Sequence, residues 1–181
     1  MKNKVIIRRE ILQKRDALSD CERTQKSELI CQRLMTDKGF IAAETILVYM
    51  PIKSEVSTIR LIEKAWTLNK RVGLPKIQGD EMNFYECRDF SELSLGAFNI
   101  LEPKTEVLIE PSHALLIMPG IVFDQHKHRI GYGKGFYDRY LKNHPNLETI
   151  ALAFDCQIID YFEAEAHDIA PNFILTESHT I

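Results

Sequence analysis

The chain has 181 residues, of which 45% are hydrophobic, and a formal net charge of −3. These values are typical of one globular domain over residues 1–181 and argue against a general nucleic-acid binder. No apolar run approaches the roughly 18 residues of a membrane span. The 4 cysteines are scattered without zinc-ligand spacing, and no signal peptide precedes them. We therefore expect a cytoplasmic protein with reduced thiols that contacts neither membrane nor nucleic acid.

The N-terminal part of the chain is predicted to be helical. Residues from about Lys2 to Leu18 lack glycine and proline and have helical periodicity. Ser19 and Glu22 then match the capping-box pattern, which predicts the start of a second helix. This helix is expected to run to about Lys38, with Gly39 as its C-terminal cap.

Basic residues occupy the apolar face of the first helix. At about 100° per residue, Lys4, Arg8 and Arg15 fall in the middle of that face. They are flanked by apolar residues on both sides: Ile7, Ile11 and Leu18 on one, Val5 and Leu12 on the other. Arg9, Glu10 and Gln13 point away. Because an inward charge needs a partner, we expect Lys4 and Arg8 to reach a bound polyphosphate. The alternatives are snorkelling side chains or a salt bridge to a carboxylate at the end of the sheet.

Three continuous apolar runs predict strands that are buried on both faces of a parallel sheet. They are Thr45–Met50, Ala114–Met118 and Thr149–Phe154. Shorter strands are expected at 71–75, 82–87, 121–124 and 173–176, a helix at 57–70, and an irregular connection at 97–103. The alternation of strands and helices predicts a three-layer α/β/α fold with a mostly parallel central sheet. Ligands of such sheets bind beyond the C-terminal strand ends, where 53–55, 119–137 and the residues from 155 onward should meet.

One stretch, Arg129–Arg139, carries the strongest functional signal. Its sequence, Arg-Ile-Gly-Tyr-Gly-Lys-Gly-Phe-Tyr-Asp-Arg, has three alternate glycines, with Lys134 between the last two. Glycine permits close backbone approach, and amides that lead into a helix N-terminus bind anions. Asp138 falls in the first predicted helical turn, where it is placed to hold a divalent cation. The stretch therefore predicts a polyphosphate site with its own metal ligand, and a purely structural glycine turn is the alternative.

Together with Met118-Pro-Gly-Ile-Val-Phe-Asp124, this stretch resembles the signature of the 5-formyltetrahydrofolate cyclo-ligase family. Further matches lie along almost the whole chain, in the order typical of the family: Lys4 and Arg8, Met50-Pro-Ile-Lys-Ser-Glu55, Ile100-Leu-Glu-Pro103 and His167-Asp168. The chain departs from the common pattern at Asn99, Phe136 and Asn172. These departures concern fine substrate preference more than the reaction.

The resemblance implies a Rossmann-like fold, similar to the NagB/RpiA/CoA-transferase-like fold. It also implies ATP- and Mg²⁺-dependent conversion of 5-formyltetrahydrofolate to 5,10-methenyltetrahydrofolate by an enzyme that we expect to be a monomer. Lys134 would be the catalytic residue, and Asp138 and Asp168 the metal ligands. ATP would contact Lys4, Arg8, Arg129, Ile130, Gly131, Tyr132, Gly133, Lys134, Gly135, Phe136 and Tyr137. The folate would contact Met50, Glu55, Tyr132, Gly133, Lys134, Gly135 and Phe136.

Several of these residues also have ordinary structural interpretations. Met50 is equally a core residue, Glu55 the N-cap of the next helix, and Asp168 the cap of a turn. Tyr132, Phe136 and Tyr137 have the spacing of packing residues on a helix. At the level of function, two alternatives stay open, because fold and phosphate site do not determine the acceptor. They are a non-catalytic nucleotide-binding regulator and a ligase for a different small amide substrate.

Overall fold

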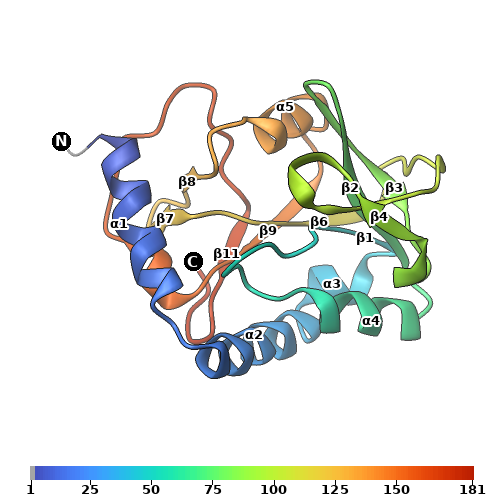
Figure 1. The fold of residues 1–181 in the computed structure, drawn as a ribbon, viewed down its shortest axis with the longest axis horizontal. Coiled ribbons are helices and arrows are strands. Elements are labelled where there is room, and N and C mark those ends of the chain that lie inside the picture. The colour runs from blue at the N-terminus through green and yellow to red at the C-terminus, as the bar shows by residue number, and fades with distance from the viewer. Residues whose placement is uncertain (1–2) are drawn as a thin grey trace.

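The central sheet of the computed structural model, which describes residues 3–181, has six strands in the order β11-β9-β6-β1-β2-β3 (Figure 1). Neighbouring strands are parallel except β2 and β3, which are antiparallel. The prediction of a mixed α/β fold with a mostly parallel sheet is therefore confirmed. The strands are β1 (Thr45–Val48), β2 (Arg71–Gln78), β3 (Glu81–Glu86), β6 (Ala114–Met118), β9 (Glu148–Leu152) and β11 (Phe173–Leu175).

The central strands are buried on both sides, as their continuous apolar sequences predict. All of β1 and β6 is buried, and successive side chains of a strand point to opposite faces. Ile46 and Val48 of β1 therefore join one hydrophobic cluster, whereas Leu47 joins the other. The alternation divides the core into two layers, one on each side of the sheet.

The helices cover the two faces unequally (Figure 1). α2 (Asp20–Met35), α3 (Lys38–Ala42) and α4 (Ile59–Thr67) lie together on one face. α5 (Phe136–Asn143) packs on the other face, where Tyr140 and Leu141 share a hydrophobic cluster with Phe84 of β3. α1 (Lys4–Asp16) lies at the side of the sheet, and the expected start of this helix at Lys2 is outside the described residues.

Two small sheets complete the fold. β7 (Val122–Asp124) pairs with β8 (Arg129–Ile130) and β10 (Ile158–Ile159), and α1 packs on this unit through Ile7 and Ile11. β4 (Leu93–Leu95) and β5 (Leu101–Pro103) form an antiparallel hairpin. The expectation of an irregular connection over 97–103 was therefore wrong for β5. Three short 3₁₀ turns lie at Phe90–Glu92, Ala97–Asn99 and Asp155–Gln157.

Local capping explains where α2 begins and ends. The capping box of Ser19 and Glu22 is present, as predicted. The expected cap at Gly39 was wrong, because α2 ends at Met35 with Thr36 as its C-cap and a new helix follows at once. The Asp37 side chain accepts hydrogen bonds from the Gly39 and Phe40 amides and so begins α3.

Two further sequence expectations concern exposure and cysteines. Val5, expected on the inward face of α1, is 62% exposed and was therefore placed wrongly. Cys21, Cys31, Cys87 and Cys156 are all free. Within residues 3–181, no helix has both the length and the apolar character that crossing a membrane requires.

Candidate functional site

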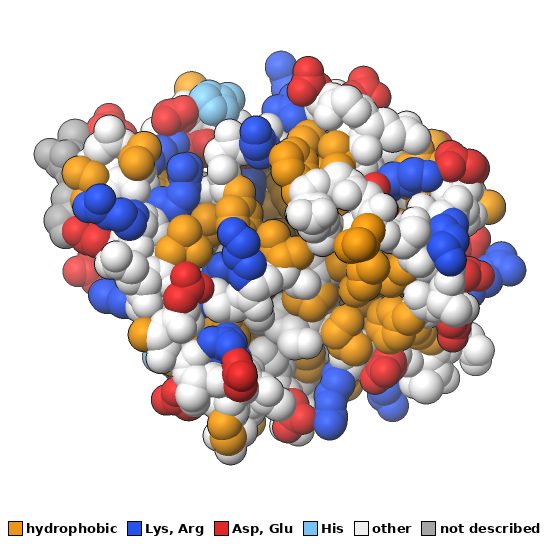
Figure 2. Space-filling model, viewed as in Figure 1, with side chains coloured by type: hydrophobic (Ala, Val, Ile, Leu, Met, Phe, Trp, Pro, Cys, Tyr) orange, Lys and Arg blue, Asp and Glu red, His pale blue; other side chains and the backbone are white. Residues whose placement is uncertain are grey.

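A cavity of about 1270 Å³ opens beyond the C-terminal ends of β1 and β6. Its wall combines α1, the turn at 52–55, the loop at 129–135, α5, the tip of the β4–β5 hairpin and the segment 165–169. Hydrophobic and basic side chains gather around a hollow on this face (Figure 2). Ligand pockets usually measure about 300–1,000 Å³, so this cavity has room for two small molecules side by side.

The glycine loop shapes one wall of this cavity between β8 and α5. Gly133 and Gly135 have φ values of +85° and +67°, in the left-handed region that favours glycine. Gly135 is the N-cap of α5, so the loop ends at the helix N-terminus, where free backbone amides attract anions. Lys134 is exposed between the two glycines, with its Nζ 5.6 Å from the centroid of the Phe98 ring. The loop therefore has the backbone geometry that the sequence predicted for an anion site.

Two arginines that line the cavity are candidates to bind an anion. The Nε atoms of Arg8 and Arg129 are buried, and neither has a hydrogen-bond partner within residues 3–181. The Arg8 guanidinium lies beside Gly133, 3.5 Å from where a Cβ of that residue would be. A buried donor without a partner costs about 1–3 kcal/mol. Both residues line the cavity, so a phosphate bound there would supply the missing acceptors.

Lys4 reaches the same cavity from the first turn of α1. Its Nζ lies 2.6 Å from Asp168 Oδ2 and 3.0 Å from Glu165 Oε1. Burial acts to lower the pKa of Lys4, but the hydrogen bonds to these carboxylates outweigh it and raise the pKa above its usual value. The structure therefore shows for Lys4 the alternative of a salt bridge to a carboxylate, and its contact with phosphate stays a prediction.

The two predicted metal ligands lie on the wall of the same cavity, but the side chains close enough to share one ion in the described chain are Glu165, His167 and Asp168, without Asp138. Asp138 and Asp168 both line the cavity, and the amide of Ile169 donates to Asp138 Oδ1. Asp138 is also 3.0 Å from Arg129 Nη2. Burial acts to raise the pKa of Asp168, but hydrogen bonds from Lys4 and the Glu165 amide lower it below its usual value. Two carboxylates on this wall offer the oxygen ligands that Mg²⁺ prefers, and the open cavity leaves room for the waters that it retains.

The opposite wall contains the predicted folate contacts. Met50 is buried, belongs to the core and also lines the cavity, so its contact with folate stays a prediction. Glu55 is buried, and its Oε2 accepts a hydrogen bond from the Ile52 amide at 3.0 Å. Thr58, not Glu55, is the N-cap of α4. Burial raises the pKa of Glu55, while the Ile52 amide and the charge of Arg15 oppose this shift.

The remaining predicted contacts also lie on the cavity wall. Ile130 is buried at the end of β8, and Gly131 follows it. Phe136 and Tyr137 are half-buried and pack against the core beneath α5. Burial raises the pKa of Tyr137 far above its usual value, so its hydroxyl stays neutral. These aromatic residues therefore combine a packing role with exposure to the cavity.

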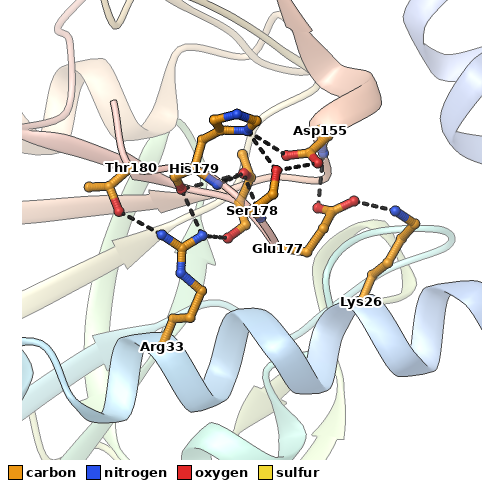
Figure 3. Close-up of polar contacts among 8 residues, drawn as sticks. Lys26, Arg33, Asp155, Glu177, Ser178, His179 and Thr180 are labelled. Atoms are coloured by element: carbon orange, nitrogen blue, oxygen red, sulfur yellow. Dashed lines mark hydrogen bonds and ion pairs between the residues drawn. The ribbon is translucent and has the colours of Figure 1, made fainter.

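Several lining residues were not predicted from the sequence, and one segment was placed correctly only in part. Phe98, at the hairpin tip, has a φ of +56° and is 59% exposed, and its ring centroid lies 6.2 Å from that of Phe136. No periodicity marks such a short hairpin. Of the segment from Asp155 onward, expected at the same edge, residues 165–169 line the cavity, whereas Asp155 itself contacts the C-terminal residues Ser178 and His179 (Figure 3). Asp155 does not line the cavity.

The comparisons with known proteins agree with this geometry. The model of the 5-formyltetrahydrofolate cyclo-ligase family matches residues 1–177. The chain belongs to this family. A 5-formyltetrahydrofolate cyclo-ligase of Escherichia coli K12 is 33% identical over 176 residues, which cover 93% of this chain and 97% of the relative.

Solved structures of family members have the same fold. A 5,10-methenyltetrahydrofolate synthetase of Aquifex aeolicus superposes with a TM-score of 0.88 at 31% identity, covering 98% of this chain and 91% of the other. A 5,10-methenyltetrahydrofolate synthetase from Mycoplasma pneumoniae has a TM-score of 0.78 at 28% identity, covering 98% and 100%. The resemblance inferred from the glycine loop is thus confirmed over the length of the family domain.

Proposed function

We propose that the chain is an ATP-dependent cyclo-ligase that converts 5-formyltetrahydrofolate to 5,10-methenyltetrahydrofolate, with release of ADP and phosphate. The observation that carries the proposal is one cavity with two chemically different walls. One wall holds the glycine loop with Lys4, Arg8 and Arg129, and the other holds Met50 and Glu55. The first wall suits a polyphosphate and the second suits a pterin. The description of the family, 5-formyltetrahydrofolate cyclo-ligase, gives the reaction that uses both.

The reaction needs alignment more than covalent catalysis. The formyl oxygen attacks the γ-phosphorus of ATP, and ADP leaves. N10 then attacks the activated formyl carbon and loses its proton, and the carbon–oxygen bond breaks to release phosphate. The amide oxygen is a poor leaving group until it is phosphorylated, so the protein must hold it in line with the γ-phosphate and neutralise the developing charge.

The residues of the cavity are suited to this task. Lys134, exposed between two left-handed glycines, is free to follow the transferred phosphoryl group. Arg8 and Arg129 offer buried guanidinium donors from opposite sides of the glycine loop. Asp138 and Asp168 would hold Mg²⁺, which neutralises phosphate charge when bound. The half-buried Phe136 and the buried Met50 would exclude water from the pterin side.

The decisive experiment is a direct assay. Purified protein is mixed with ATP, Mg²⁺ and 5-formyltetrahydrofolate, and the near-ultraviolet absorbance of the methenyl product is followed. We expect product formation and ATP consumption that both require the folate. ATP hydrolysis that ignores the folate, or the absence of methenyl product, would overturn the proposal. The proposal includes a cytoplasmic monomer, and sedimentation measurements test the oligomeric state.

A further inference from the structure

Arg15 is a charged residue that the proposed reaction leaves unexplained. It lies near the end of α1 and is 0% exposed. The sequence placed it on the apolar face, where a charge needs a partner. The structure supplies hydrogen-bond acceptors from three segments that are far apart in the chain.

Each acceptor of Arg15 lies at or beside the wall of the cavity. Nε donates to Ser54 Oγ at 3.0 Å, Nη2 to the Tyr132 hydroxyl at 3.1 Å, and Nη1 approaches the Gly120 carbonyl at 3.4 Å. Ser54 is in the turn that carries Glu55, and Tyr132 is in the glycine loop. Gly120 lies just after β6 and itself lines the cavity. One guanidinium thus connects the folate side to the phosphate side.

The three acceptors are neutral, so the charge of Arg15 needs compensation from farther away. Two carboxylates are candidates: Asp16, which accepts a hydrogen bond from the Ser54 hydroxyl, and the buried Glu55, whose pKa the charge of Arg15 acts to lower. Burial raises the pKa of Glu55, whereas the Ile52 amide, the charge of Arg15 and a hydrogen bond from Tyr132 act to lower it. The titratable and charged groups that face Glu55 are Arg15, Tyr49, Lys53, Tyr132 and Tyr137.

We propose that Arg15 is a positioning residue for the reaction, whose buried guanidinium fixes the glycine loop and the Glu55 turn relative to each other. It does not line the cavity and so acts through Tyr132 and Ser54. The inference rests on the proposed function, because it assigns the two walls to ATP and folate. Loss of Arg15 should therefore weaken the binding of both substrates and make Glu55 harder to ionise.

Arg33 in α2 provides a matched control for a purely structural arginine. Its guanidinium also donates to three acceptors: the carbonyls of Thr176 and His179 and the Thr180 hydroxyl (Figure 3). These contacts anchor the C-terminal segment to α2, and none of the three acceptors lines the cavity in the described chain. Arg33→Met therefore removes a comparable set of hydrogen bonds without touching either wall.

The experiment compares Arg15→Met, Arg15→Lys and Arg33→Met with the wild type. We measure thermal stability, KM for ATP and folate, kcat, and the binding of 5-formyltetrahydrofolate by calorimetry over a range of pH. A misplacement of about 1 Å in a site can cost about 100-fold in rate, so we expect both KM values to rise by up to about 100-fold in Arg15→Met. The acidic limit of folate binding should move to higher pH, because Glu55 loses a neighbouring positive charge. Arg15→Lys, which keeps the charge, should retain the wild-type acidic limit.

The outcomes separate this inference from the proposed function. If Arg15→Met loses stability as Arg33→Met does but keeps both KM values and the acidic limit, Arg15 is only structural and the inference is wrong. If Arg15→Met does not fold, Arg15→Lys decides: unchanged KM values with lowered stability also overturn it, because the lysine lacks the fork that reaches three segments. A wild-type protein without folate-dependent ATP consumption would instead refute the proposed function.

Discussion

Replacing Arg8 with methionine tests whether α1 forms part of the ATP site. Methionine keeps an apolar stem of similar length but removes the guanidinium, whose Nε is buried without a partner in the described chain. The group lies beside Gly133, so a phosphate in the glycine loop would accept from it. A hydrogen bond to a charged group contributes about 1.5–3 kcal/mol. This corresponds to about a 10- to 150-fold weaker Kd for ATP.

The same substitution has an opposite consequence for the ligand-free protein. Burying an unpaired donor costs about 1–3 kcal/mol, and Arg8→Met removes that cost. We therefore expect the free energy of unfolding without ligand to stay the same or rise while ATP binding weakens. Calorimetric titration with ATP and Mg²⁺, and urea unfolding without ligand, measure the two effects.

Arg9→Met is the control, because Arg9 is the adjacent residue of α1 and is exposed. It should change neither ATP affinity nor stability by more than experimental error. Equal ATP affinities for the two variants would remove α1 from the site. A large loss of stability in Arg8→Met would show that the guanidinium is a structural group with partners of its own.

Four further substitutions test other parts of the site and fold. Lys134→Ala should lose roughly 2–4 kcal/mol of transition-state stabilisation in kcat/KM with little change in Tm; near-normal turnover would reject it as the catalytic residue. Asp138→Asn should raise the Mg²⁺ concentration needed for half-maximal rate, and an unchanged titration would leave Asp138 as a helix-start residue. Burial raises the pKa of Glu55 above the usual value of about 4.3, so KM for folate should increase as the pH falls through this raised pKa. Glu55→Gln should abolish this pH dependence. If the pH dependence persists in the variant, Glu55 is not the group that causes it. Ser19→Ala removes the capping box and should lower the free energy of unfolding by about 1 kcal/mol without changing either KM; an unchanged urea midpoint would contradict this.

Local sequence signals predicted the core of the fold well. The apolar runs that became β1 and β6 needed no other information, because strands buried on both faces tolerate little else. Ser19 and Glu22 lie within one turn, so their capping box is readable from the sequence. Gly39 was misinterpreted because Asp37, two residues earlier, starts a new helix.

Features that depend on distant contacts were not predictable. The β4–β5 hairpin is short and lacks periodicity, so Phe98 gave no sign that it lines the cavity. The position of Arg15 on the apolar face was visible, but its acceptors come from segments 39, 105 and 117 residues away. Val5 was placed inward by its periodicity, yet it is exposed and lies outside the core cluster that holds Ile7 and Ile11. The roles of the site residues stay predictions.

The ion pair between Lys4 and Asp168 joins positions 164 residues apart. Both segments line the cavity, so a ligand that contacts both, as proposed, would act as a reversible crosslink between them. Fraying of either end then requires the ligand to leave, and occupancy adds its binding free energy to the cost of opening. Amide hydrogen exchange in the first turns of α1 and at 165–169 should therefore slow together when the cavity is filled.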